Sequence, residues 1–220
     1  MPTFAYRLFE IPAVYAINQM VGAPTVRRYR ELIARHLSKD PARRIIEIGC
    51  GLGTARPLFG PDYTGIDINA AYIRKAQQSF SGKFCVVDAA HLPFAPNTFD
   101  DALSIATTHH LSDEQLSSMI RQAVTIASIL HIVDAILPLS SRSWLKSMYF
   151  RMDRGRHART IDQLQNVVSQ NACLEYFQTL EGPLHDVCYI RASRIGSDAN
   201  VASLTRLCLH DPRADASSIT

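Results

Sequence analysis

The sequence predicts an α/β fold, with a seven-stranded, mostly parallel sheet, helices on both of its faces and an antiparallel last strand. Three observations predict it. Between residues 44 and 133, short apolar segments alternate with segments whose apolar residues follow helical spacing. After residue 170, two further apolar segments can close the sheet. The 220-residue chain is 47% hydrophobic and 20% charged, which is enough apolar material for one large core.

The order of the elements can be read along the chain. Strands are expected at residues 44–48, 63–67, 83–87, 101–105, 128–133, 174–180 and 185–192. Helices are expected at residues 26–37, 69–80, 112–127, 141–150 and 160–170. Ser112 with Gln115, and Thr160 with Gln163, form the capping-box pattern that opens a helix. Asn69 can cap the helix that begins there.

Charge and cysteine usage narrow the class of protein. The formal net charge of +3 is too small to favour nucleic acid as a partner. The five cysteines are scattered singly, which favours a reduced interior. The first twenty residues do not have the pattern of a signal peptide, and the longest apolar stretch, 123–139, is interrupted by His131 and Asp134 and is short for a membrane span. We therefore expect a cytoplasmic protein.

A glycine-rich turn follows the first strand. The segment reads IIEIGCGLGT, with glycines at 49, 51 and 53, and glycine lets the backbone approach a ligand closely. The G-x-G-x-G spacing differs from the G-x-G-x-x-G of dinucleotide-binding proteins. Glu47, just before the turn, would repel a pyrophosphate but could hold a cationic ligand through hydrogen bonds. Taken alone, the turn is also compatible with a purely structural role.

Acidic residues end the next two strands. Asp67 can accept hydrogen bonds from both hydroxyls of a ribose, although a helix-start cap is the alternative. Asp88 can accept a hydrogen bond from the exocyclic amine of adenine, although a turn residue is the alternative. Because the carboxyl ends of parallel strands share one edge of the sheet, Glu47, Asp67 and Asp88 together indicate a nucleoside site.

These motifs resemble those of the class I S-adenosylmethionine (SAM)-dependent methyltransferases, over residues 40–138. IIEIGCGLGT is similar to the first motif, YTGIDIN to the second, VVDAAHLPFAPNTFD to the third and FDDALSIATTHHL to the fourth. The resemblance implies a Rossmann-like fold with SAM as cofactor. It implies cofactor contacts from Glu47, Gly49, Cys50, Gly51, Gly53, Asp67, Ile68, Asp88, Ala89 and Thr107. The Pro-Gly-Gly turn that often precedes the family's fifth strand is absent, which predicts a shortened turn there.

Two histidines at the end of the fourth motif are the catalytic candidates. If the methyl acceptor is a hydroxyl, a base must take its proton as the methyl is transferred in line, and histidine titrates in a suitable range. His109 and His110 lie where the fourth strand opens toward the methyl group. The alternative is that one of them packs or caps near Ser112. His91, in the loop after Asp88, is expected to be structural.

The resemblance also divides the chain into parts. Residues 1–40 are expected to form a helical cover over the cofactor, with Tyr15 touching its methionine end, although core packing, a lipid-facing surface or a dimer surface are alternatives. Residues 41–195 are expected to form the SAM-binding domain, with an acceptor-side insertion at about 139–160. Residues 196–220 are expected to form a loosely ordered tail.

A basic segment lies in that insertion. Substrate contacts are expected from Arg154, Arg156 and His157, because arginine can clamp a carboxylate or phosphate, and from Asp134 at the end of the fifth strand. A solvated loop, and for Asp134 the start of a turn, are the alternatives.

The sequence therefore predicts a SAM-dependent methyltransferase for a small-molecule acceptor, with O- or N-methylation left open. The histidines form no convincing metal-ligand cluster, so no metal is expected. A non-catalytic SAM-fold subunit and an NAD-dependent oxidoreductase are the alternative functions. A monomer and a homodimer both fit, as does peripheral contact with a membrane.

Overall fold

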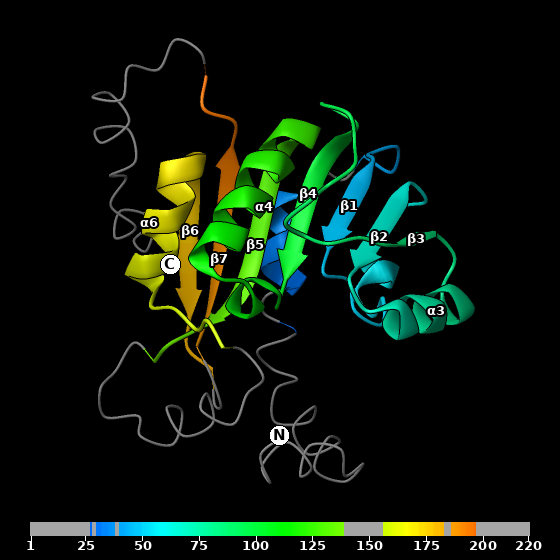
Figure 1. Ribbon diagram of the computed structural model, residues 1–220, viewed down its shortest axis with the longest axis horizontal. Coiled ribbons are helices and arrows are strands. Elements are labelled where there is room, and N and C mark those ends of the chain that lie inside the picture. Colours follow the sequence, from blue (N-terminus) through cyan, green and yellow to red (C-terminus); the bar gives the residue numbers. More distant parts are fainter. Residues whose placement is uncertain (1–26, 28–29, 38–39, 139–155, 183–185, 197–220) are drawn as a thin grey trace, which may run out of the picture.

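The computed structural model describes residues 27, 30–37, 40–138, 156–182 and 186–196. These residues form one seven-stranded sheet in the order β3-β2-β1-β4-β5-β7-β6, seen edge to edge in Figure 1. The strands are β1 (Ile45–Ile48), β2 (Tyr63–Asp67), β3 (Lys83–Val86), β4 (Phe99–Ile105), β5 (Ala127–Ile136), β6 (Cys173–Leu180) and β7 (Asp186–Ser193). Strands β1 to β5 pair in parallel, and β7 is antiparallel to both of its neighbours. The predicted fold class is confirmed.

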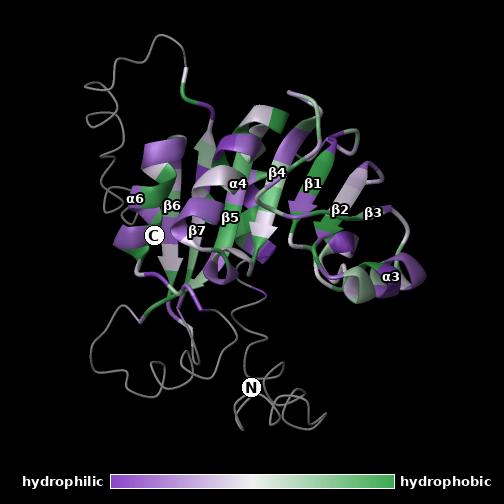
Figure 2. Cartoon of the chain, viewed as in Figure 1, coloured by the Kyte–Doolittle hydropathy of each residue, from purple (hydrophilic) through white to green (hydrophobic). Residues whose placement is uncertain are grey.

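Helices lie on both faces of the sheet. Helices α4 (Asp113–Ile126) and α6 (Ile161–Asn171) pack together over one face. Helix α3 (Ala70–Ser79) and the helical residues 30–36 contribute to the hydrophobic cluster of the other face. In Figure 2 the central strands are mostly hydrophobic, whereas the helices also carry hydrophilic residues.

Successive residues of β1 serve the two faces in turn, as a strand requires. Ile46 and Ile48 join the cluster under α4 and α6, and Ile45 joins the opposite one. Ile46 and Ile48 are both 0% exposed, so this short strand lies in the centre of the core. Its carboxyl end is therefore held firmly where the glycine turn begins.

The predicted helix starts are confirmed. The Asn69 side chain accepts hydrogen bonds from the backbone N–H groups of Ala71 and Tyr72. Both reciprocal capping-box bonds are present at Ser112 and at Thr160. Each cap satisfies backbone donors that the first turn of a helix leaves without an intrahelical partner.

Helix α4 runs into β5 without a connecting turn. The helix ends at Ile126 and the strand begins at Ala127, whose N–H still donates to the carbonyl of Ala123. The sequence predicted a shortened turn here, because the Pro-Gly-Gly segment is missing. In the structure no turn residue remains between the two elements.

The differences from the expected elements come from strand pairing. Strand β4 begins two residues before the expected start, at Phe99, which pairs with Ala127 of β5. Strand β5 extends to Ile136, because its last residues pair with the start of β7. Two 3-10 turns, η1 (Arg56–Leu58) and η2 (Thr108–His110), were not expected.

Several expected segments lie outside the described residues. They are the N-terminal cover to residue 26, most of the 139–160 insertion with its helix at 141–150, and the tail from residue 197. Within the part of the chain that the structure describes, no helix has the length and apolar character needed to cross a membrane.

Candidate active site

The residues singled out in the sequence gather where the parallel strands end, the edge marked by the strand arrowheads in Figure 1. Hydrogen bonds connect neighbouring strand ends there. Gly51 N–H donates to Asp67 over 2.9 Å, joining β1 to β2, and the Thr107 hydroxyl lies 3.3 Å from the carbonyl of Gly49, joining β4 to β1. Asp134 accepts the Thr108 N–H over 2.6 Å, joining β5 to β4. The strand ends thus form one continuous edge.

The glycine turn needs its glycines for different reasons. All three have positive φ, at +78° for Gly49, +53° for Gly51 and +74° for Gly53, a region that other residues rarely adopt. A Cβ on Gly49 would lie 2.2 Å from the hydroxyl oxygen of Thr107, and one on Gly53 would lie 3.0 Å from Phe84. A Cβ on Gly51 would meet nothing within 4 Å. Gly49 and Gly53 are therefore required by the protein's own packing, whereas Gly51 presents bare backbone to open space.

Asp67 and Asp88 are both partly exposed and both shape the chain beside them. The Asp67 carboxylate accepts from Gly51 N–H and, over 2.8 Å, from Asn69 N–H. Asp88 accepts from Ala90 N–H over 2.9 Å, the turn role that was its alternative. A carboxylate has about four acceptor positions, so each can also accept from a ligand.

Glu47 lies in the core rather than at the open edge. It is 3% exposed, and the buried hydroxyl of Tyr63 donates to its carboxylate. Burial raises the pKa of Glu47 to about 7, and the hydrogen bond from Tyr63 offsets only part of that effect. The structure thus gives the Glu47 carboxylate a protein partner, the Tyr63 hydroxyl.

The remaining cofactor candidates differ in exposure. Ile68, directly after Asp67, is a large apolar side chain that is 71% exposed. Cys50 is buried and Ala89 packs against the core. Tyr15 lies outside the described residues.

The two candidate histidines occupy turn η2, at the end of β4. His109 is buried, and its Nδ1 lies 2.5 Å from Asp134 Oδ1. His110 is exposed, and its ring centroid lies 4.1 Å from that of His109. The structure therefore separates the two roles that the sequence left open: one imidazole is fixed in the protein, and the other faces outward.

Asp134 is not available to a substrate, which corrects one expectation. It is 1% exposed, and it accepts hydrogen bonds from the N–H and hydroxyl of Thr108, the ring and N–H of His109 and the N–H of Ala135. The sequence missed this role because it depends on the pairing of β4 with β5. Asp134 orients the turn instead of contacting an acceptor.

The ionisation of Asp134 fixes the tautomer of His109. Burial acts to raise the pKa of Asp134, but the charge of His109 and hydrogen bonds from His109 and Thr108 outweigh it and leave that pKa below its usual range. An ionised carboxylate only accepts, so Nδ1 of His109 carries a proton.

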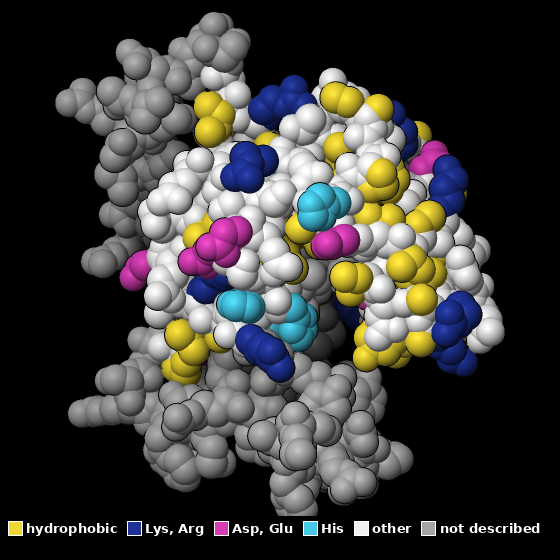
Figure 3. Space-filling model, viewed as in Figure 1, with side chains coloured by type: hydrophobic (Ala, Val, Ile, Leu, Met, Phe, Trp, Pro, Cys, Tyr) yellow, Lys and Arg dark blue, Asp and Glu magenta, His cyan; other side chains and the backbone are white. Residues whose placement is uncertain are grey.

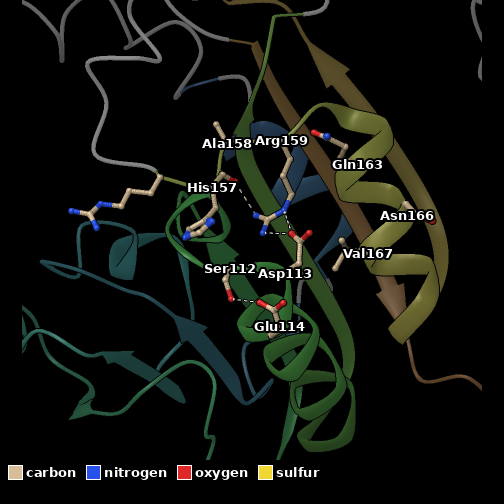
Figure 4. A pocket seen from close by; sticks show the side chains of 10 residues that line it. Ser112, Asp113, Glu114, His157, Ala158, Arg159, Gln163, Asn166 and Val167 are labelled. Carbon is tan, nitrogen blue, oxygen red and sulfur yellow. Dashed lines mark hydrogen bonds and ion pairs between the residues drawn. The ribbon is translucent and has the colours of Figure 1, made fainter.

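The basic segment before α6 docks on the same turn. The His157 N–H donates to the carbonyl of His109 over 3.0 Å. Arg159, which the sequence did not single out, is 7% exposed and reaches Asp113 at the start of α4, as Figure 4 shows. Arg156 is exposed, and Arg154 lies outside the described residues.

A cavity of about 500 Å³ opens beside these residues. Its walls come from the starts of α4 and α6 and from residues 156–159. Among the residues lining it are Arg156 and His157, two of the expected substrate contacts. On the face seen in Figure 3, histidine and arginine side chains lie next to one another, with acidic side chains nearby.

Comparison with known proteins relates part of the chain to methyltransferases. Residues 45–128 match a family described as a methyltransferase domain. The methyltransferase phqN of Penicillium fellutanum is 31% identical over 102 residues, covering 41% of this chain and 31% of the relative. The O-methyltransferase resE of Aspergillus sclerotiorum is 30% identical over 109 residues, covering 44% of this chain and 41% of the relative. The matches thus span less than half of these curated relatives.

Solved structures share the fold at low sequence identity. A SAM-dependent methyltransferase from Methanosarcina mazei superposes with a TM-score of 0.62 at 21% identity, covering 74% of this chain and 97% of that one. The magnesium protoporphyrin IX methyltransferase of Synechocystis, solved with bound S-adenosylhomocysteine (SAH), gives 0.62 at 16% identity and covers 89% of each chain. With these matches and the strand order, the chain is similar to methyltransferases: residues 45–128 match the methyltransferase-domain family, and the described sheet has the fold of solved SAM-dependent methyltransferases.

Proposed function

We propose that this protein transfers a methyl group from SAM to a small-molecule acceptor. The observation that carries the proposal is Gly51, whose missing side chain leaves open space at the carboxyl edge of the sheet. In open α/β sheets, ligands bind in the crevice at this edge. Curated relatives with O-methyltransferase in their names support transfer to oxygen as the first reaction to test.

The residues present fit the cofactor. SAM has hydroxyl and amine donors and no phosphate, and the strand ends offer carboxylate acceptors in Asp67 and Asp88. The backbone at Gly51 can approach the ligand closely, because nothing occupies the space that a side chain would take. Ile68 offers an exposed apolar surface beside Asp67 against which a nucleoside ring can lie. When bound, SAM supplies a methyl group already activated by its sulfonium charge.

The protein's own contribution to transfer is orientation and proton removal. The Asp134 carboxylate holds the Nδ1 proton of His109 and so directs Nε2 as the base toward an acceptor hydroxyl. His110, exposed beside it, is the second candidate. The cavity lined by Arg156 and His157 is the proposed acceptor side, where cationic and N–H donors favour an acceptor with oxygen functions.

The test compares two glycine substitutions. Gly51→Ala adds a methyl group at the proposed cofactor contact, and Gly196→Ala adds one in open space at the far end of β7. We expect Gly51→Ala to weaken SAH binding by at least roughly tenfold, about 1.4 kcal/mol, and Gly196→Ala to leave it unchanged. Isothermal titration calorimetry with SAH measures both.

The same titration separates the alternatives. Heat of binding with NADH but not with SAH would point to the oxidoreductase instead. Binding of SAH that is equal in Gly51→Ala and the unmodified protein would remove the cofactor assignment of the glycine turn. A screen with methyl-labelled SAM against metabolite extracts then distinguishes an enzyme from a non-catalytic subunit.

A further inference from the structure

One buried arginine connects the acceptor side to the turn that carries the histidines. The Arg159 guanidinium donates to the carbonyls of Thr108 (2.9 Å), Leu111 (2.7 Å) and His157 (3.0 Å). It also donates to Asp113 Oδ1 over 2.6 and 2.9 Å. Five donors of a planar guanidinium can serve several acceptors at fixed angles, which a lysine ammonium cannot reproduce.

Two of the carbonyls that Arg159 binds belong to the residues just before and just after the candidate catalytic histidines. Thr108 and Leu111 lie on either side of His109 and His110, so one side chain holds both ends of turn η2. The neighbouring His157 N–H binds the carbonyl of His109 between them. From the opposite side, Asp134 holds the N–H and ring of His109. The turn is therefore fixed by a cation on its carbonyls and an anion on its N–H groups.

This charge arrangement matches the polarity of the turn. Carbonyl oxygens carry partial negative charge and are stabilised by the guanidinium, and N–H groups carry partial positive charge and are stabilised by the carboxylate. Arg159 is 7% exposed, so water competes little for these bonds. Asp113 is exposed, with 71% of its side chain accessible, and its ion pair with Arg159 is correspondingly weaker.

We propose that Arg159 is a positioning residue that keeps the His109 ring in register with the acceptor side of the site. This rests on the proposed function, in which His109 acts on the acceptor. Arg159 acts on His109 through the backbone carbonyls of the turn, and it also lines the cavity proposed as the acceptor side.

The experiment follows the turn directly, without an acceptor. Hydrogen exchange of the Thr108 amide, which donates to Asp134, reports whether the turn stays closed. The ¹⁵N shifts of the His109 ring report which nitrogen carries the proton. For Arg159→Ala we expect Thr108 exchange to rise at least about tenfold beyond any change in the slowest amides of β5, and the Nδ1 shift of the His109 ring to move as its hydrogen bond to Asp134 loosens. SAH affinity is expected to stay within about threefold.

Two variants serve as controls, and a third tests rescue. Arg121→Ala removes an arginine that joins α4 to Asn171 of α6, far along the helix from the turn, and we expect neither signal to change. Asp113→Asn removes the exposed ion pair and should also leave both signals unchanged. Arg159→Lys should restore part of the protection, because an ammonium can still donate to one or two of the carbonyls.

The outcomes decide between positioning and general stability. Equal Thr108 exchange in Arg159→Ala and Arg121→Ala, after correction for global unfolding, would overturn the proposal, as would an unchanged His109 ring signature. If Arg159→Ala does not fold, Arg159→Lys against Asp113→Asn gives the same comparison. Loss of SAH binding in Gly51→Ala concerns the cofactor alone, so failure of the proposed function and failure of the Arg159 role remain separate results.

Discussion

Single side chains at this edge have roles that their positions alone do not reveal. Asp67 and Asp88 stand at strand ends, as expected for ligand-binding acids, and each also closes a local turn. Glu47 precedes the glycine turn, but its carboxylate accepts a hydrogen bond from the Tyr63 hydroxyl in the core. The difference is burial: the first two are partly exposed, and Glu47 is 3% exposed.

The burial of Glu47 makes the stability of the protein depend on pH. Its folded pKa of about 7 lies above the ordinary value of 4.5, so the folded state binds the proton more tightly. This stabilisation is complete below pH 4.5 and is lost as pH rises through 7. Between pH 5 and pH 8, the free energy of unfolding should fall by up to about 3 kcal/mol less in Glu47→Gln than in the unmodified protein. Urea unfolding at the two pH values measures it.

Glu31→Gln is the matched control for this prediction, because Glu31 is exposed and pairs with Arg27 one helical turn away. It should leave the pH dependence unchanged. An equally steep decline in Glu47→Gln would show that another group is responsible.

Helices could be predicted from the sequence where residues close together in the chain determine them. The spacing of apolar residues and the caps at Asn69, Ser112 and Thr160 predicted α3, α4 and α6 to within a residue or two. The full length of β5 and the turn η2 could not be predicted, because they depend on partners from distant parts of the chain. Arg159 was missed for the same reason: its acceptors lie about fifty residues away, at Thr108 and Leu111.

The glycine turn gives a prediction at this scale. Gly49→Ala would place a Cβ 2.2 Å from the Thr107 hydroxyl oxygen at a φ of +78°, whereas Gly51→Ala meets only the strain of positive φ. We expect Gly49→Ala to lower the free energy of unfolding by more than about 2 kcal/mol and Gly51→Ala by about 1 kcal/mol. Thermal or chemical denaturation compares them. Equal losses would mean that Thr107 moves aside without cost.

Across the whole molecule, the two edges of the sheet hold different groups of side chains. The carboxyl edge gathers the candidate site. Near the amino edge, a buried network runs from Arg43 to Asp101, His131 and Tyr189, with distances of 2.5, 3.1 and 2.8 Å. It joins the start of β1 to β4, β5 and β7, so it ties the parallel half of the sheet to the antiparallel half. This network therefore joins the strands away from the candidate site.

Tyr189→Phe tests that separation. It leaves Nδ1 of the buried His131 without its phenol partner, and we expect a loss of about 1–2 kcal/mol in the free energy of unfolding with unchanged SAH affinity. Tyr72→Phe, at a half-exposed position on α3, should change neither quantity. A fall in SAH affinity with Tyr189→Phe would show that the two ends are coupled.

The direct passage from α4 into β5 has a consequence for how this architecture tolerates change in length. Two residues, Leu111 and Ser112, connect turn η2 to α4. Helix α4 is followed directly by β5, the strand that carries Asp134. An extra residue between Ile126 and Ala127 would have to be accommodated as a bulge, because side chains alternate along a strand and a one-place slip would turn Asp134 to the opposite face from His109. Related sequences of different length are therefore expected to differ before His109 or after Asp134, and to keep the number of residues between these two positions constant.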